Sequence, residues 1–179
     1  MLIKTIFSGF GGQGVLSMGY ALADAAMREG KYITYLPSYG AEVRGGTANC
    51  TISVSDEEIA SPVASDPDFV VAMNQPSFLR FQSLIQAGGL ILVNSSIVNI
   101  SSVRGDIEVV AVPTSELAEK LGNLKVANMV MLGAFIKVSN LISLPLLLKN
   151  LPTILGGKRA SLLKINKEAL EQGFNYVKG

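Results

Sequence analysis

The chain has 179 residues, 49% of them hydrophobic, and its 15 basic and 14 acidic residues leave a formal net charge of +1. This length predicts a single domain over residues 1–179, and the balanced charge excludes the basic footprint of a nucleic-acid-binding protein. No apolar run reaches the roughly 18 residues of a membrane span, and the strand expected directly after Met1 leaves no room for a signal peptide. We therefore expect a cytoplasmic chain with neither a nucleic-acid nor a membrane partner.

Histidine is absent, and Cys50 is the single cysteine. The chain can therefore form neither a histidine-assisted nucleophile nor a histidine metal site. One cysteine gives no internal disulfide and no iron–sulfur cluster. We expect no catalytic residue and no metal site on this chain, which favours a binding or regulatory subunit over a self-sufficient enzyme.

The first predicted strand, over residues 2–8, runs into a glycine-rich turn and then into an Ala-rich helical pattern over residues 14–29. A strand that turns abruptly into a helix presents unpaired N–H groups and the positive end of the helix dipole, which together favour an anion. The spacing of the glycines fits G-x-G-x-x-G. We predict that this turn holds a phosphate-bearing molecule; the alternative is a tight turn that only lets helix and strand pack closely. The candidate binding residues are Gly9, Gly11, Gly12, Gln13 and Gly14.

The second predicted strand, over residues 32–36, argues against a nicotinamide dinucleotide. A dinucleotide fold places an acidic residue at the end of this strand, roughly 20 residues after the glycines, to hold a ribose hydroxyl. Here the strand ends in Pro37-Ser38-Tyr39. A Walker A loop is excluded as well, because no Gly-Lys-Ser/Thr follows the glycines. A free-standing NAD(P)-dependent oxidoreductase is kept only as an alternative.

The loop over residues 37–46 is the second candidate binding segment, with Arg44, Gly45 and Gly46 as its candidate residues. Ligands of open α/β sheets gather outside the carboxyl ends of the strands, so we expect this loop to face the glycine turn. The guanidinium of Arg44 suits a phosphate or a carboxylate, and the two glycines let backbone approach a partner. The alternative is a solvated loop in which Glu42 and Arg44 pair with each other.

The rest of the chain alternates strand and helix patterns, which predicts a doubly wound α/β fold, a mostly parallel sheet with helices on both faces. A half-exposed strand over residues 47–55 carries Cys50, for which we expect plain packing. The helix over 125–138 is apolar nearly all round, as expected of a core helix or an interface. Further strands are expected over 69–73, 90–93 and 107–112, and further helices over 76–87 with Asn74 as its cap, 116–121 with Thr114 and Ser115 as caps, 144–148 and 166–177.

Together these motifs resemble the gamma subunit of the 2-oxoacid:ferredoxin oxidoreductases, which is equivalent to one domain of the single-chain pyruvate enzymes. Ala41 departs from the family, since many members have proline there, and we expect it to alter loop stiffness more than chemistry. Residues 37–50 are most similar to the 2-oxoglutarate and branched-chain enzymes, so 2-oxoglutarate is the favoured substrate. The resemblance rests on residues 9–15, 38–50, 61–62 and 128–134.

The resemblance implies a complex that oxidatively decarboxylates a 2-oxoacid to an acyl-coenzyme A and reduces ferredoxin. It implies thiamine diphosphate and Mg²⁺ on the alpha and beta subunits and iron–sulfur clusters on beta and delta. This chain has no Gly-Asp-Gly…Asn-Asn thiamine motif. We expect it to bind the phosphates of coenzyme A, to assemble with the alpha, beta and delta subunits, and to be inactive alone. The alternative is a purely architectural subunit, in which the glycines serve packing and Arg44 serves assembly.

Overall fold

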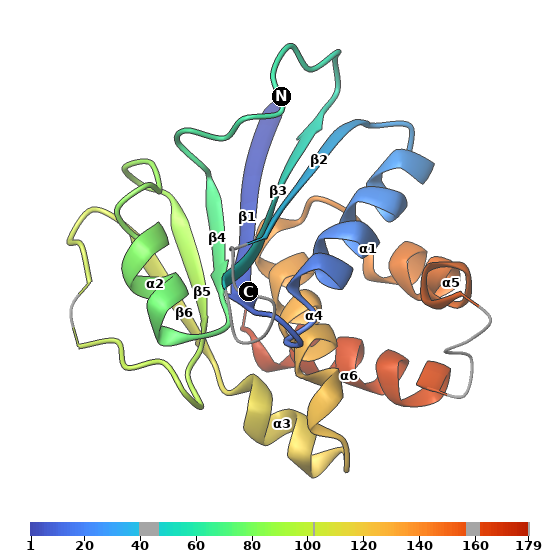
Figure 1. Cartoon of the computed structure of the whole chain (residues 1–179). Helices are drawn as coiled ribbons and strands as arrows, with labels where there is room; N and C mark the ends of the chain where they lie inside the picture. The colour runs from blue at the N-terminus through green and yellow to red at the C-terminus, as the bar shows by residue number, and fades with distance from the viewer. Residues whose placement is uncertain (40–46, 102, 157–161, 179) are drawn as a thin grey trace.

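A six-stranded sheet runs through the centre of the molecule (Figure 1). The computed structural model describes residues 1–39, 47–101, 103–156 and 162–178. The parallel strands β1, β4, β5 and β6 are neighbours, so their carboxyl ends meet at one edge of the sheet. The expected doubly wound, mostly parallel sheet is confirmed. In spatial order the strands are β2 (Tyr32–Tyr39), β3 (Thr47–Ser55), β1 (Leu2–Phe10), β4 (Phe69–Ala72), β5 (Leu90–Asn94) and β6 (Glu108–Val112).

β3 runs antiparallel to both of its neighbours, β1 and β2. A parallel pair needs a crossover of about a dozen residues or more, and the segment 40–46 between β2 and β3 is too short for one. The last residue of β2 pairs with Ala48, and Phe10 at the end of β1 pairs with Thr47. β2 also continues through Pro37, where the sequence predicted a loop, because an edge strand tolerates a residue without an N–H.

The helices cover the two faces of the sheet unequally (Figure 1). α2 lies on one face against β4 and β1, whereas α1, α4, α5 and α6 gather on the other. The expectation of helices on both faces is confirmed. The helices are α1 (Val15–Arg28), α2 (Gln75–Phe81), α3 (Thr114–Lys120), the 3₁₀ turn η1 (Leu124–Val126), α4 (Ala127–Ser139), α5 (Leu144–Leu155) and α6 (Leu163–Tyr176).

α2 begins as the sequence predicted and ends earlier. Asn74 is its N-cap, and the Oδ1 atom of that side chain accepts a hydrogen bond from the Ser77 N–H at 2.9 Å. The expected end at residue 87 is wrong. The Gln86 N–H donates to the Pro67 carbonyl at 3.1 Å instead of continuing the helical pattern.

The expected capping of α3 by the hydroxyls of Thr114 and Ser115 is wrong. Thr114 is the first helical residue, and no side-chain cap bond forms at the residue before it. The hydroxyl of Ser115 instead accepts a hydrogen bond from the Asn94 amide at 3.0 Å. The Glu116 N–H, one of those that a cap would satisfy, donates to Ser96 Oγ at 3.2 Å. The turn after β5 therefore supplies the cap from a distant part of the chain.

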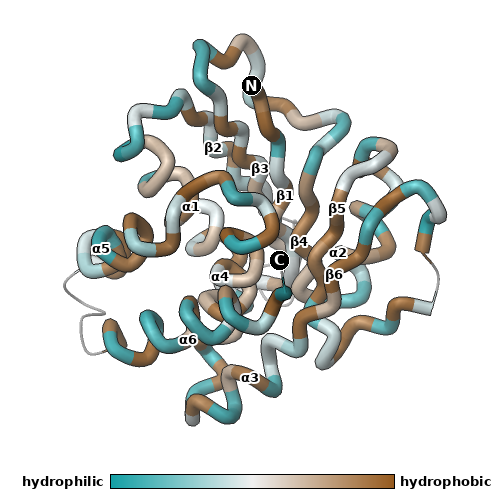
Figure 2. Tube along the Cα trace, turned by 180° about the vertical axis from the view of Figure 1, so that it is seen from behind, coloured by the Kyte–Doolittle hydropathy of each residue, from teal (hydrophilic) through white to brown (hydrophobic). Residues whose placement is uncertain are grey.

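α4 lies in the larger of two apolar clusters, and its residues from Ala127 to Ile136 are all buried. The smaller cluster lies between the sheet and α2. Figure 2 shows mostly hydrophobic residues along β4 and β5, whereas α6 is largely hydrophilic. Of the two roles that the sequence left open for the apolar helix, core or interface, the structure assigns the core.

Two glycines let α4 and α6 approach each other backbone to backbone. A Cβ atom at Gly133 would meet the carbonyl of Leu170, and one at Gly173 would meet the carbonyl of Val130. Neither carbonyl lies at the end of a flexible side chain, so a methyl group at either position requires the two helices to move apart.

Gly133→Ala is expected to lower the free energy of unfolding by about 1–3 kcal/mol, because overpacking a tight core contact costs that much. Gly105→Ala is the matched control, since a Cβ there meets no atom of the described residues within 4 Å, and we expect it to change stability by less than about 0.5 kcal/mol. Urea denaturation measures both. Equal unfolding midpoints for the two variants would contradict the close helix contact.

Candidate functional site

The glycine turn, residues 9–14, lies at the carboxyl edge of the sheet, and the side-chain amide of Gln13 holds it there. Its Oε1 atom accepts hydrogen bonds from the Phe10 N–H at 2.7 Å and from the Asn74 amide at 3.1 Å. Its Nε2 atom donates to the Met73 carbonyl at 3.1 Å. The amide of Gln13 is thus engaged within the protein, and it positions the turn against the end of β4 and the start of α2.

The segment that carries the second set of candidate residues is anchored at the same edge. The residue before the segment, Tyr39, pairs with Ala48, and the residue after it, Thr47, pairs with Phe10 at the end of β1. Both ends of the segment therefore lie at this edge. Arg44, Gly45 and Gly46 themselves lie outside the described residues. That these three residues face the glycine turn stays a prediction.

The glycines of the turn divide into two kinds. A Cβ at Gly9 would lie 2.6 Å from Gln13 Oε1 and 3.0 Å from Met73 Cβ, and one at Gly14 would meet the amide of Asn128 in α4. Close packing at these two positions therefore requires glycine. Gly12 has a φ of +97°, the left-handed conformation that glycine favours, and a Cβ there would meet no atom of the described residues within 4 Å. Toward the described part of the chain, Gly12 therefore faces open space, which suits an anion-binding turn.

The first turn of α1 presents its N–H groups beside the glycines. Gly14, with a φ of +74°, is the N-cap residue and offers no side-chain cap. Within the described residues, no hydrogen-bond acceptor is found for the N–H groups of Val15, Leu16 and Ser17. Such N–H groups at a helix start carry the positive end of the helix dipole.

Side chains of β2 and β3 also hold the first turn of α1 in place. The Tyr35 hydroxyl donates to the Leu16 carbonyl at 3.2 Å, and Cys50 Sγ lies 3.6 Å from the Val15 carbonyl. Cys50 is fully buried, and burial raises the pKa of its thiol to about 12. The thiol therefore stays protonated at neutral pH and is no nucleophile. The expectation of plain packing for Cys50 is confirmed.

A cavity of about 820 Å³ opens beside the glycine turn. We call it the turn cavity, and no Asp or Glu is found among its described lining residues. It is lined by Phe10, Gly11, Gly12, Gly14, Val15, Leu16, Ser17, Tyr20, Tyr35, Ala48, Lys125, Val126, Asn128, Met129, Ile154, Leu155, Leu162 and Asn166.

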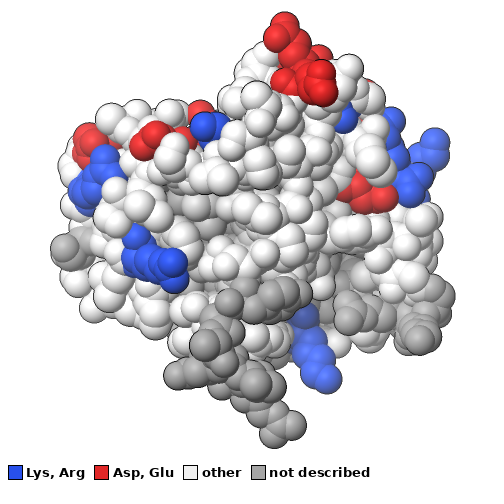
Figure 3. All heavy atoms as spheres, turned by 45° about the horizontal axis from the view of Figure 1, so that its top comes forward, with Lys and Arg blue, Asp and Glu red and all other residues white. Residues whose placement is uncertain are grey.

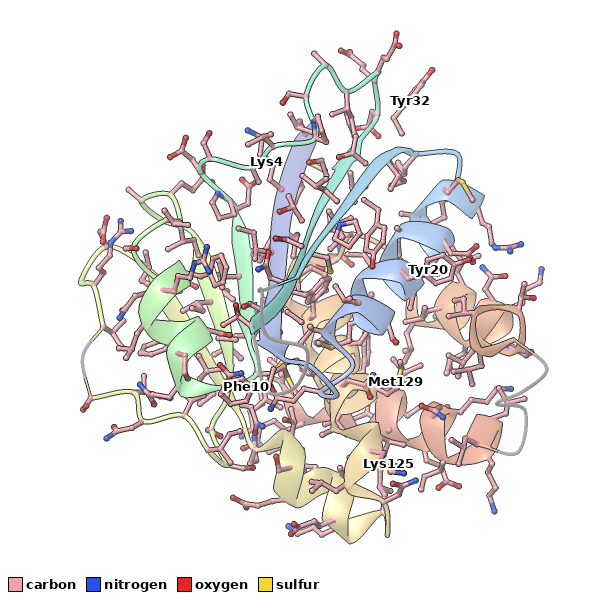
Figure 4. All side chains as sticks on the ribbon, in the orientation of Figure 1. Lys4, Phe10, Tyr20, Tyr32, Lys125 and Met129 are labelled. Atoms are coloured by element: carbon pink, nitrogen blue, oxygen red, sulfur yellow. The ribbon has the colours of Figure 1, made fainter. Side chains whose placement is uncertain are left out.

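Lys125 and Asn128 were not among the predicted site residues, because they follow the turn by more than 100 residues. The Asn128 amide donates to the Gly14 carbonyl at 3.4 Å, which ties α4 to the start of α1. Lys125 is exposed on η1, and no acidic partner for its ammonium is found within the described residues. Figure 4 shows Lys125 and Met129 below the first turn of α1, with Tyr20 further along that helix.

Other classes of site are absent from the described part of the chain. No group of three His, Cys, Asp or Glu residues is placed there to hold a metal ion. Among the helices described, none is long and apolar enough to cross a membrane. On the face drawn in Figure 3, charged side chains of both signs stand toward the margins, and most of the middle is uncharged.

Comparison with known proteins gives a family match over residues 4–176, to pyruvate ferredoxin/flavodoxin oxidoreductase. The ketoisovalerate oxidoreductase subunit VorA of Methanothermobacter thermautotrophicus is 44% identical over 131 residues, which are 73% of this chain and 27% of VorA. The chain thus spans about a quarter of the length of that relative. The 2-oxoglutarate synthase subunit KorC of Methanothermobacter marburgensis is 36% identical over 143 residues, 76% of this chain and 77% of KorC.

Solved structures agree with the fold. The gamma subunit of a keto/oxoacid ferredoxin oxidoreductase from Geobacter sulfurreducens superposes with a TM-score of 0.84 at 25% identity, over 98% of this chain and 95% of that one. A 2-oxoglutarate:ferredoxin oxidoreductase from Magnetococcus marinus, solved with 2-oxoglutarate, coenzyme A and succinyl-CoA, has a TM-score of 0.89 at 24% identity, over 99% and 32%. The resemblance to the gamma-subunit family is confirmed.

Gln13→Leu is expected to lower the free energy of unfolding by about 1–3 kcal/mol, because it leaves the buried Asn74 amide and the Met73 carbonyl without their partner. Gln172→Leu is the control, since Gln172 is exposed on α6 and surface changes of this kind cost less than about 0.5 kcal/mol. Chemical denaturation of both variants measures the difference. If both unfold at the denaturant concentration of the unmodified chain, Gln13 does not hold the turn.

Proposed function

The chain belongs to the pyruvate ferredoxin/flavodoxin oxidoreductase family, and we propose that it is the gamma subunit of a cytoplasmic, multi-subunit 2-oxoacid:ferredoxin oxidoreductase. Such a complex oxidatively decarboxylates a 2-oxoacid, forms the acyl-coenzyme A and reduces ferredoxin, an activity of the EC 1.2.7 type. This chain contributes the binding of coenzyme A phosphates and the assembly of the subunits. The observation that carries the proposal is the open face of the glycine turn beside the uncapped start of α1.

Three features of the turn suit a phosphate. As far as the described residues reach, Gly12 leaves open space where a side chain would otherwise stand. The N–H groups of Val15, Leu16 and Ser17 start a helix whose dipole favours an anion. The turn cavity beside them contains the cationic side chain of Lys125, and its described lining has no carboxylate to repel the ligand.

The other cofactors of the proposed complex do not fit this chain. An iron–sulfur cluster needs about four cysteine ligands, and the chain has one cysteine, buried and protonated. Mg²⁺ needs carboxylate or phosphate oxygens, and within the described residues no group of three His, Cys, Asp or Glu side chains is placed to hold a metal ion. We therefore assign thiamine diphosphate, Mg²⁺ and the clusters to the alpha, beta and delta subunits.

The alternatives have less support. A free-standing NAD(P)-dependent oxidoreductase needs an acidic residue at the end of the second strand, and β2 ends in Pro37-Ser38-Tyr39. A purely architectural subunit is favoured by Gly9 and Gly14, because both glycines serve close packing. The architectural alternative does not explain why the turn is open at Gly12.

For the substrate we propose 2-oxoglutarate, with a branched-chain 2-oxoacid as the competitor. The relatives support both, since KorC is a 2-oxoglutarate synthase subunit and the more similar VorA is a ketoisovalerate oxidoreductase subunit. The described lining residues of the turn cavity include no arginine. We propose that the pocket for the 2-oxoacid carboxylate belongs mainly to the other subunits.

For assembly we propose the open sheet face, the side of β2 that α2 leaves uncovered (Figure 1). Ile33 and Tyr35 of β2 pack toward α1 in the larger apolar cluster, so the alternating residues Tyr32 and Leu36 point the other way. Their exposed fractions are 52% and 43%. Large apolar side chains on a sheet face without a covering helix favour a protein contact.

The occupant of the open sheet face is inferred from the relatives. This chain corresponds to 27% of VorA, so in VorA the same kind of module is linked to a much longer remainder. KorC, of which the chain covers 77%, contains little else. We propose that the open sheet face binds the separate subunit that corresponds to the remainder of VorA.

Gly12→Asp is expected to raise the KM for coenzyme A in the assembled complex by about tenfold or more, because it places a carboxylate where a phosphate would bind and one charge-assisted hydrogen bond is worth about 1.5–3 kcal/mol. The KM for the 2-oxoacid should change little. Steady-state kinetics with each substrate varied in turn measures both. Arg44→Ala is expected to act in the same direction but more mildly, by about 1.5–3 kcal/mol if its contact is charge-assisted.

Gly12→Asn is the matched control, since it imposes the same backbone cost at φ +97° without the charge. It should raise the KM for coenzyme A much less than Gly12→Asp does. If an intact Gly12→Asp complex has unchanged coenzyme A kinetics, the architectural alternative is the better account of the turn.

Leu36→Arg is expected to prevent co-purification of the chain with its co-expressed partner subunits, because a charge would be buried in an apolar contact. Leu84→Arg is the control, since Leu84 is also 43% exposed but lies beyond α2, away from β2. Size-exclusion chromatography of both variants with the partners measures assembly. A normal complex for Leu36→Arg would place the interface elsewhere.

A further inference from the structure

The lining residues of the turn cavity fall into two chemically different sets, which we call its polar and its apolar wall. The polar wall comprises the glycine turn, the first turn of α1 and η1, and it offers backbone N–H groups and the ammonium of Lys125. The apolar wall comprises residues from further along α1 and from α4 and α5, with Tyr20, Met129 and Ile154 among them. A cavity of about 820 Å³ is within the usual range of small-molecule sites, about 300–1,000 Å³. Such walls suit a ligand with phosphates at one end and a flat or apolar group at the other.

A hydrogen bond from its N–H fixes the backbone position of Lys125. The Lys125 N–H donates to the Oδ1 atom of Asn123, which caps η1, at 3.0 Å. Its exposed ammonium differs from those of Lys31 and Lys164, which pair with Asp56 and Glu168. A cation that has no acidic partner among the described residues, beside a cavity whose described lining lacks carboxylates, raises the local concentration of anions.

The apolar wall carries an aromatic pair. The rings of Tyr20 and Tyr35 meet edge to face, with centroids 6.5 Å apart and an interplanar angle of 76°. The Tyr35 hydroxyl is bonded to the Leu16 carbonyl, which fixes this ring, and Tyr20 lies against it at the cavity. Aromatic rings of this kind stack on nucleic-acid bases without sequence preference.

We propose that the turn cavity receives the 3′-phosphoadenosine end of coenzyme A, with the base against Tyr20 and the 3′-phosphate on Lys125. This inference rests on the proposed function, in which the glycine turn holds the pyrophosphate. It adds a basis for specificity, because a cation placed beyond the pyrophosphate site distinguishes coenzyme A from nucleotides that lack a third phosphate. Lys125 is then a specificity residue and Tyr20 a residue that binds the base.

The test compares coenzyme A with dephospho-coenzyme A, which lacks only the 3′-phosphate, as substrates of the assembled complex. Lys125→Gln is expected to raise the KM for coenzyme A about tenfold, as the loss of one charge-assisted contact does, and to leave the KM for dephospho-coenzyme A unchanged. Lys120→Gln is the control, an exposed lysine on the nearby α3 that does not line the cavity. It should leave both values unchanged.

Tyr20→Ala tests the apolar wall. It is expected to raise the KM for both coenzymes by the same factor, about fivefold or more for a lost stacking contact, whereas Tyr176→Ala on α6 should alter neither. If Lys125→Gln affects both coenzymes equally or neither, while Gly12→Asp still impairs coenzyme A, this inference is overturned and the proposed function stands. If neither Lys125→Gln nor Gly12→Asp changes coenzyme A kinetics, both are overturned.

Discussion

The hydrogen bonds of one side-chain amide, that of Gln13, hold the glycine turn in its place. The amide joins the turn to the Met73 carbonyl at the end of β4 and to Asn74, and Asn74 in turn caps α2 through the Ser77 N–H. The Ser8 hydroxyl of β1 donates a hydrogen bond of 2.8 Å to Ser77 Oγ, which joins α2 back to β1. The starts of two helices on opposite faces of the sheet are therefore fixed at one point, and the first N–H groups of α1 are left facing the cavity.

The apolar helix α4 provides the second support of the site. Gly133 permits a close approach of α4 to α6. In this buried position α4 places Asn128 against Gly14, and η1, which precedes it, beside the turn cavity. Lys125 thus owes its position to packing far from the turn. The proposed ligand contact at Lys125 therefore depends on the packing of α4 against α6, so stability and binding are linked through α4.

Much of the fold could be predicted from local patterns. The β-branched runs gave the strands, and the change from glycines to an Ala-rich helical period located the turn and α1. The strand β3 was predicted but its antiparallel direction was not, because strand direction depends on the length of segment 40–46 and on the neighbouring β1. The cap of α3 was misassigned, since Ser96, which bonds the Glu116 N–H, comes from a distant turn.

The candidate site could be predicted only in part, for the same reason. The glycines are contiguous in sequence, so their spacing revealed them. Gln13 was predicted as a ligand contact, and only the fold reveals that Met73 and Asn74 occupy its amide. Tyr20 and Lys125 belong to separate helical segments with no motif, and only their meeting around one cavity marks them.

The most direct test of the central claim is the structure of the assembled complex with coenzyme A bound. The account predicts phosphate oxygens within about 3 Å of the N–H groups of Val15, Leu16 and Ser17, beside Gly12. Coenzyme A bound with its phosphates away from this turn, and with these N–H groups facing a partner subunit or solvent, would contradict it.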